Sequence, residues 1–217
     1  ITVSSPLIDS ADIPVTLPLA KPVQIKNFHL TAHLEYGRAT PAPLWDTVEV
    51  KDLGLALAMG QSVVNVKGTA ARGIAHITAA SADVNSDDLP VVLPLVKPVA
   101  IRNLHLSARA QYPPREGAQP LELADVTDFG VAVVMGNSTA DVQGTLKAGV
   151  AQAIINAKGL NTGDLPIAIP FKKPVQISGL HAAVDATARE ARLSGLVFEV
   201  FNGSVKGKGG MGFGSVA

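Results

Sequence analysis

The chain has 217 residues, with 18 basic and 18 acidic side chains, and it contains no cysteine. This balanced charge, without a long basic run, excludes an electrostatic case for nucleic acid, so no nucleic-acid partner is predicted. The absence of cysteine excludes a disulfide framework and cysteine-ligated metals. No apolar run reaches the roughly 20 residues that a membrane-spanning helix needs.

A proline-rich stretch occurs three times in the sequence. Its copies cover residues 12–25, 88–101 and 164–177, so that Pro14, Pro90 and Pro166 are evenly spaced. A fixed period of this length predicts a stacked repeat architecture in which each unit contacts the next. The predicted units are 12–87, 88–163 and a shortened third unit, 164–217. Residues 1–11 align with the end of a unit, so we expect the chain to be a slice of a longer repetitive protein.

The proline-rich stretch is predicted to be neither a central strand nor a helix. Its prolines lack the N–H that a strand ladder needs, and they disfavour helix in the residue before them. The residues between the prolines of the second copy are apolar: Val91, Val92, Leu93, Leu95 and Val96. We expect them to be buried against other structure, although an inter-domain linker is the alternative.

Between the proline-rich stretches, alternating apolar residues predict four strands per unit. In the first unit these are residues 22–36, 47–59, 63–69 and 74–84, with a loop at 37–43. The alternation slips by one residue at Asn27 and again near Asp52, which predicts β-bulges. The second unit repeats this pattern, the third is shortened, and no stretch has sustained helical periodicity.

The predicted class is all-β, built from repeated antiparallel β-meanders whose period is the spacing between Pro14 and Pro90. Two architectures fit: separate small sandwiches joined by linkers, or one elongated curved sheet whose proline-rich segments carry the chain back across it. The second is favoured because a sandwich of this size is marginally stable and bulky core residues are scarce. An open sheet of this kind has an apolar lining that something else must cover, which marks a ligand or membrane site.

Three segments resemble the AsmA family of bacterial envelope proteins. They are residues 54–68 and 130–144, in which Gly/Ser turns join apolar strands, and the closing residues 196–209. The resemblance implies a periplasmic protein anchored to the bacterial inner membrane, with the anchor outside this chain. It also implies membership of the repeating β-groove, bridge-like lipid carriers, in which a loop crosses back over each meander. The implied partners are a phospholipid or another acyl-chain lipid, and envelope proteins.

The candidate site consists of alternate apolar positions that we expect to line a lipid groove. They are Val23, Ile25, Phe28, Leu30, Leu55, Leu57, Met59, Leu104, Leu106, Val131, Val133, Met135, Leu180, Phe198 and Val200. The expected function is non-enzymatic shielding of acyl chains during phospholipid transport between the inner and outer membranes. The alternatives are a structural or adhesive stalk of tandem β-sandwich modules, and an outer-membrane assembly factor whose apolar face docks another protein.

Three histidines, His29, His105 and His181, recur once per unit. A metal site needs several ligands that converge on one point, and we expect no second histidine or carboxylate to recur at a fixed spacing beside them. A structural role is therefore predicted for the histidines, and no metal or other cofactor.

Three lysines, Lys21, Lys97 and Lys173, each precede a proline. They are predicted to be solvated charges at the rim of the groove, with lipid phosphate as the alternative partner. The sequence shows neither a nucleophile elbow nor an acid–base pair, so no enzymatic activity is predicted.

Overall fold

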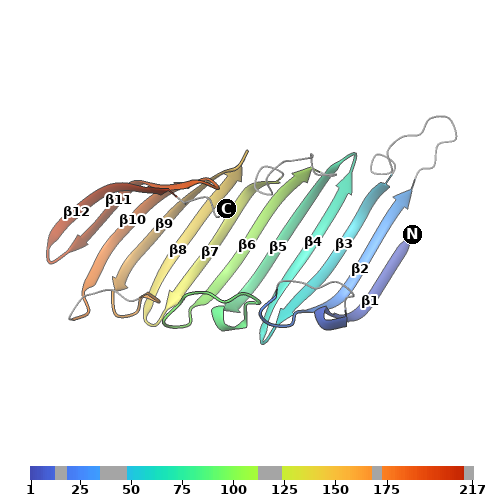
Figure 1. The fold of residues 1–217 in the computed structure, drawn as a ribbon, viewed down its shortest axis with the longest axis horizontal. Coiled ribbons are helices and arrows are strands. Elements are labelled where there is room, and N and C mark those ends of the chain that lie inside the picture. Colours follow the sequence, from blue (N-terminus) through green and yellow to red (C-terminus); the bar gives the residue numbers. More distant parts are fainter. Residues whose placement is uncertain (13–18, 35–47, 112–123, 168–172, 213–217) are drawn as a thin grey trace.

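The computed structural model describes residues 1–12, 19–34, 48–111, 124–167 and 173–212, whose strands form a single antiparallel sheet (Figure 1). The strands are β1 (Thr2–Asp9), β2 (Gln24–Leu34), β3 (Val48–Met59), β4 (Ser62–Ala71), β5 (Ile74–Asn85), β6 (Ala100–Gln111), β7 (Ala124–Met135), β8 (Ser138–Lys147), β9 (Val150–Asn161), β10 (Gln176–Ala186), β11 (Glu190–Val200) and β12 (Gly203–Gly212). Each strand is hydrogen-bonded to the next one in the chain, from β1 to β12. The predicted all-β class and continuous meander are confirmed.

The strands recur with the period of the sequence. β3 and β7 each have 12 residues, and their first residues, Val48 and Ala124, are separated by the same interval as Pro14 and Pro90. The pairs β4/β8, β5/β9 and β6/β10 are related in the same way. β1 is joined to β2 through a proline-rich connection, as β5 is joined to β6. Residues 1–11 therefore correspond to the last strand of a unit.

Both predicted bulges are present. Asn27 and Asn103 adopt a left-handed backbone conformation, each with φ 53°, and Gly179 takes the equivalent place with φ 59°. The pairing register shifts at these positions and again beside Asp52. Because successive strand residues point to opposite faces, each extra residue keeps the apolar side chains on one face.

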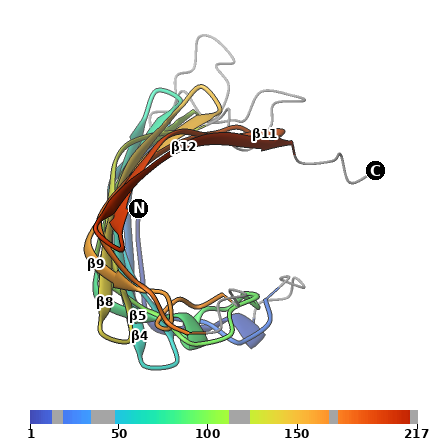
Figure 2. The same ribbon diagram turned by 90° about the vertical axis from the view of Figure 1, so that its left-hand side faces the viewer.

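The two faces of the sheet differ completely in charge. Residues paired directly across neighbouring strands share a face, and the pairing gathers Val, Leu, Ile, Phe, Met, Ala, Gly and Ser on one of them. None of the residues that the pairing places on this face is charged. Figure 2 shows that the sheet curves into a C-shaped trough. Leu95, from a connection that lies inside the C, packs on the apolar face, which is therefore the concave one.

We define the proline segments as residues 10–23, 86–99 and 162–175, of which residues 13–18 and 168–172 lie outside the described part of the chain. The end of the sheet where their described residues lie is the lower rim (Figure 1). The second segment joins Asn85 of β5 to Ala100 of β6, which are paired neighbours. The chain therefore leaves and re-enters the sheet at the same end. The expectation that the segment carries the chain back across the sheet is wrong for this connection. The segment instead overlies one end of the concave face.

Each proline segment is closed at its base by the same pair of hydrogen bonds. Ser86 N donates to Val99 O, and Val99 N donates to Ser86 Oγ, both at 2.9 Å. Ser10 with Val23, and Thr162 with Val175, repeat both bonds. The three segments therefore start from one rigid geometry, in which the short 3₁₀ turns η1 (Ser10–Asp12) and η2 (Ser86–Asp88) begin the first two.

The expected burial of the segment's apolar side chains is only partly correct. Leu95 packs against the cluster around Val99 and Met135. Val92 and Val96, however, are 85% and 64% exposed, and Val91 and Leu93 are exposed as well. An extended segment can direct only some of its side chains toward the sheet that it overlies, so the others face the solvent.

A part-buried hydrogen-bond chain holds the second and the third proline segment each to a strand turn. Asp88 Oδ2 accepts from Ser62 Oγ at 2.7 Å, and Ser62 Oγ accepts from Asn85 N at 2.9 Å. Gly60 adopts φ +58°, and a Cβ there would lie 2.2 Å from Asp88 Oδ1. Glycine is needed at this turn for both reasons. Asp164 binds Ser138 Oγ in the same way, at 2.8 Å.

Replacing Asp88 with alanine should lower the free energy of unfolding by about 1–3 kcal/mol, because it leaves the buried Ser62 hydroxyl without its acceptor. Chemical denaturation measures the change. Asp87→Ala is the matched control, since the Asp87 side chain is exposed and only its backbone is used. Equal losses in the two variants would contradict a specific role for the Asp88 carboxylate.

Candidate functional site

The concave face is the candidate site, and it is apolar across ten consecutive strands. One row of directly paired residues runs through β3 to β12: Leu55, Val66, Ala79, Leu106, Phe129, Gly144, Ala153, Val184, Leu193 and Gly209. No member of the row has a polar side chain. The sheet ladder already satisfies the backbone groups between them, so this surface offers an occupant only apolar contact.

Four serines, Ser5, Ser62, Ser81 and Ser138, are the polar residues that the pairing places on this face. Each hydroxyl donates a hydrogen bond within the protein. Ser5 binds Leu7 O at 3.0 Å, Ser81 binds Val63 O at 2.6 Å, and the other two bind the aspartates of the proline segments. The serines therefore leave the face without a free donor for a polar ligand.

Most of the concave face is not covered by other parts of the described chain. The solvent-accessible area is 14577 Å², whereas a compact protein of this mass exposes about 9,400 Å². None of the described side chains is less than 2% exposed. Two small clusters of buried residues exist, around Met59 and Met135, and proline-segment residues pack against both. A single-layer sheet, which leaves both of its faces open, contributes to this excess area.

The structure places all of the predicted site residues on the concave face or directly beside it. Val23 lies at the base of the first proline segment and packs on the cluster that contains Met59. Met59 and Met135 are only 7% and 6% exposed, so they belong to the buried clusters and are not available to a ligand. The remaining predicted residues are half-buried, as expected for the lining of an open trough.

The sequence-based selection missed the contributions of β1, β4, β5, β8, β9 and β12. Their concave-facing residues include Ile8, Val66, Ile77, Val142, Ile155 and Val205. In β4 and β8 the alternation of apolar and polar residues would have identified the concave-facing residues. In β5 the alternation does not distinguish the two faces, because alanine occupies both, as at Ala79 and Ala80.

The repeated histidines lie on the convex face. The ring of His29 covers Gly54, where a Cβ would lie 2.0 Å from the ring, and its Nε2 is 3.1 Å from Asp52. His105 and Asp128 repeat this pair at 3.6 Å. A carboxylate therefore does recur at one fixed spacing after two of the histidines, and the expectation that none recurs was wrong. Within the described residues, no group of three or more potential metal ligands forms.

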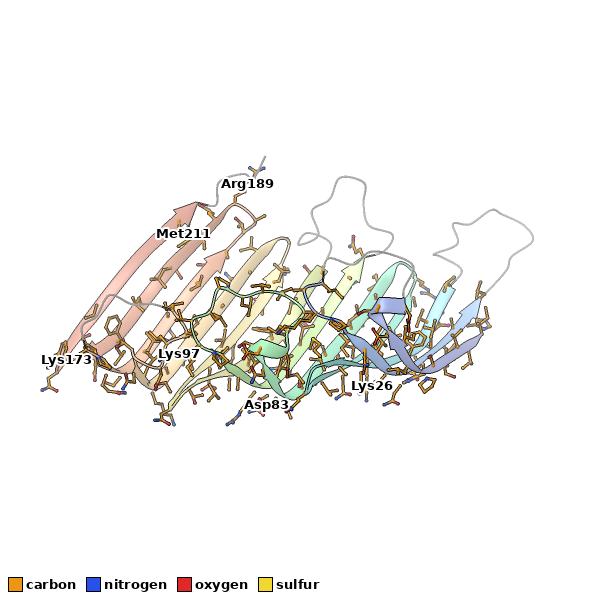
Figure 3. All side chains as sticks on the ribbon, turned by 60° about the horizontal axis from the view of Figure 1, so that its bottom comes forward. Lys26, Asp83, Lys97, Lys173, Arg189 and Met211 are labelled. Atoms are coloured by element: carbon orange, nitrogen blue, oxygen red, sulfur yellow. The ribbon has the colours of Figure 1, made fainter. Side chains whose placement is uncertain are left out.

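Two of the repeated lysines have protein partners that the sequence did not predict. Lys21 Nζ donates to Asp87 O, and Lys97 Nζ donates to Gly163 O. They are exposed, but they are not the free rim charges that we expected. Lys173 is also exposed and lies on the same rim as Lys97 (Figure 3).

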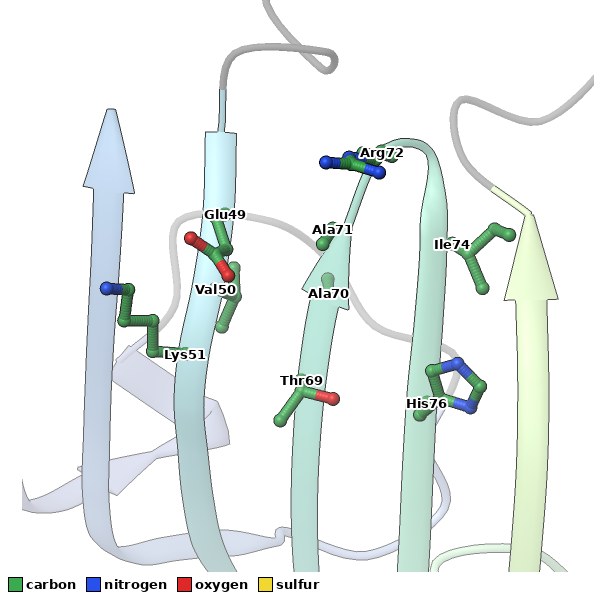
Figure 4. Close-up of a pocket in the computed structure, with 9 residues that line it drawn as sticks. All are labelled: Glu49, Val50, Lys51, Thr69, Ala70, Ala71, Arg72, Ile74 and His76. Atoms are coloured by element: carbon green, nitrogen blue, oxygen red, sulfur yellow. The ribbon is translucent and has the colours of Figure 1, made fainter. Parts of the chain in front are cut away.

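Depressions on the convex face have mixed linings that include charged and polar side chains. One, of about 410 Å³, lies over β3, β4 and β5, and Figure 4 shows Glu49, Thr69 and His76 among its lining residues. Another, of about 550 Å³, lies beside His105 and Asp128. Ionised and hydrogen-bonding side chains make these hollows poor sites for an alkyl chain, so the concave face remains the candidate.

The fold and its concave face define a single-layer β-trough protein. Comparisons of the chain with models of known families, with curated proteins and with solved structures found no match. Within the described residues, no helix is long and apolar enough to cross a membrane.

Proposed function

We propose that this chain shields the acyl chains of lipids in its trough, as a non-enzymatic part of an AsmA-like periplasmic protein. Its role in this proposal is phospholipid transport between the inner and outer membranes, with an inner-membrane anchor outside this chain. One observation carries the proposal: the concave face is apolar and uncharged through all of its strands, and most of it is uncovered.

The energetics of acyl-chain burial suit this surface. Removing apolar area from water contributes about 25 cal/mol per Å², or about 0.8 kcal/mol for each CH₂ group. An alkyl chain needs no hydrogen bonds, and the concave face offers none. The polar head group remains in the open mouth of the C, in contact with water. Because no charge lines the face, we expect little selection between head groups.

The alternative of tandem β-sandwich modules does not fit this chain. A sandwich needs two sheets whose inner faces interdigitate, whereas the described strands form one sheet with an uninterrupted order. The assembly role remains a second candidate, since an apolar segment of another protein fits the same open face.

Native mass spectrometry of the purified chain tests the proposal. We expect mass increments that correspond to one or more phospholipids. They should disappear on detergent extraction and return on incubation with phosphatidylethanolamine vesicles. A mass without lipid, before and after the vesicles are added, would contradict the carrier function. A co-purifying protein in place of lipid would favour the assembly role.

A further inference from the structure

The proline segments are joined to one another as well as to the sheet. Ala20 N, in the first segment, donates to Pro90 O in the second at 2.8 Å. Val96 N, in the second, donates to Pro166 O in the third, also at 2.8 Å. The two bonds are equivalent under the repeat, since Ala20 and Val96 are related by one period and so are Pro90 and Pro166.

The lysines add a second tie at each junction. Lys21 reaches Asp87 O and Lys97 reaches Gly163 O, and in both cases the partners are 66 residues apart. Each acceptor lies at the base of the next proline segment, within the hydrogen-bonded closure formed at Ser86 or Thr162. Two ties at each of the two junctions link the described parts of the three segments into one strap along the lower rim (Figure 3).

This strap is stiffer than an ordinary surface loop. Proline fixes φ near −65°, and an extended proline-rich chain advances about 3.1 Å per residue with little freedom. At the opposite, upper rim, the described turns after β4 and β8 are tight, and no hydrogen bond links one to the other. The sheet itself is compliant, because the twist between neighbouring strands ranges from about −10° to −35°.

We propose that the strap sets the spacing of successive units along the lower rim, and with it the twist of the trough. Lys21 and Lys97 act as positioning residues that tie each proline segment to the unit that follows. A tie along one rim fixes that edge, while the upper rim follows the intrinsic twist of the strands. The shape of the concave face is then determined at the junctions between units. The strap has this role whether or not lipid occupies the trough.

Distances between spin labels on the lipid-free protein test the strap, because the chain has no cysteine of its own. Cysteines at Gln61 and Asn137 report on the lower rim, and cysteines at Arg72 and Ala148 report on the upper rim. Both pairs join exposed, equivalent turns of the first and second units. Lys21→Met should broaden the lower-rim distance distribution at least twofold, while the upper-rim distribution changes less.

Two controls separate the tie from a general effect of lysine removal. Lys26→Met removes an exposed lysine from the convex face of β2 and should change neither distance. Lys21→Arg keeps a donor and should restore the narrow lower-rim distribution. An unchanged lower-rim distribution in Lys21→Met and in the double variant Ala20→Pro/Lys21→Met would overturn the proposal.

The second junction provides an independent variant. Lys97→Met, with labels at Asn137 and Asn202, should broaden the distance between the lower turns of the second and third units. Circular dichroism of each variant must show an unchanged β-sheet spectrum. Unchanged distances in these variants would count against the strap alone, whether or not the parent protein binds lipid. A parent protein that binds no lipid, with distances that change in the variants, would count against the carrier function alone.

Discussion

Replacing Ala79 with glutamate should reduce the lipid bound to the purified chain at least tenfold. Ala79 lies in the central row of the concave face, paired with Val66 and Leu106. An ionised carboxylate under an acyl chain loses part of its hydration, and the effective cost is several kcal/mol when no partner compensates. Since about 1.4 kcal/mol corresponds to a tenfold change in affinity, occupancy measured by native mass spectrometry should fall clearly.

The adjacent residue provides the matched control for this variant. Ala80 lies on the convex face, is exposed, and pairs with Asn65 and His105. Ala80→Glu therefore makes the same chemical change on the same strand, and it should leave the bound lipid unchanged. Both variants should retain the β-sheet circular dichroism spectrum of the parent. Equal lipid loading in the two variants would show that the concave face is not where lipid binds.

Separating the chain between Asp87 and Asp88 should destabilise both halves strongly. The cut parts β5 from β6, which are joined by eleven residue pairs from Ile74–Gln111 to Asn85–Ala100. Fragments 1–87 and 88–217 then each expose a long strand edge with unpaired backbone groups, which favours aggregation. We expect lower melting temperatures and poor solubility for each fragment alone, measured by calorimetry and analytical ultracentrifugation.

A chain that is cut only after folding is the control for this experiment. A protease site placed at the exposed Val92 leaves the β5–β6 pairing intact. After cleavage the two pieces should remain associated until denaturant is added. Two separately soluble fragments, each with its own sharp unfolding transition, would instead indicate independent modules and contradict the continuous sheet.

Much of this fold could be predicted from the sequence because strand alternation is a strong and local pattern. The slips at Asn27 and Asp52 predicted bulges, and register shifts occur at both places. The even spacing of the proline-rich stretches related each strand to its copy. The scarcity of bulky side chains predicted a single-layer sheet with one apolar face, since a second sheet would need large residues to fill the space between the layers.

The parts that could not be predicted depend on contacts between distant residues. Lys97 and Gly163 meet only because the proline segment runs toward the next unit, and no local pattern encodes that direction. The same holds for the burial of Met59 beneath the first segment's base, where its alternation matched that of the open lining. Accessibility within a single apolar face is decided by the connections above it, and their path is a tertiary property.

The face alternation, the bulges and the strap contacts together limit how the number of strands in such a trough can change. Inserting or deleting one residue in a strand exchanges its two faces, so that charged side chains such as those of Lys67 or Arg102 would enter the apolar lining. Whole units of four strands preserve strand direction, bulge position and strap contacts together. A protein of this design therefore keeps all three features when it lengthens or shortens in steps of about 19 Å, the advance of one complete unit.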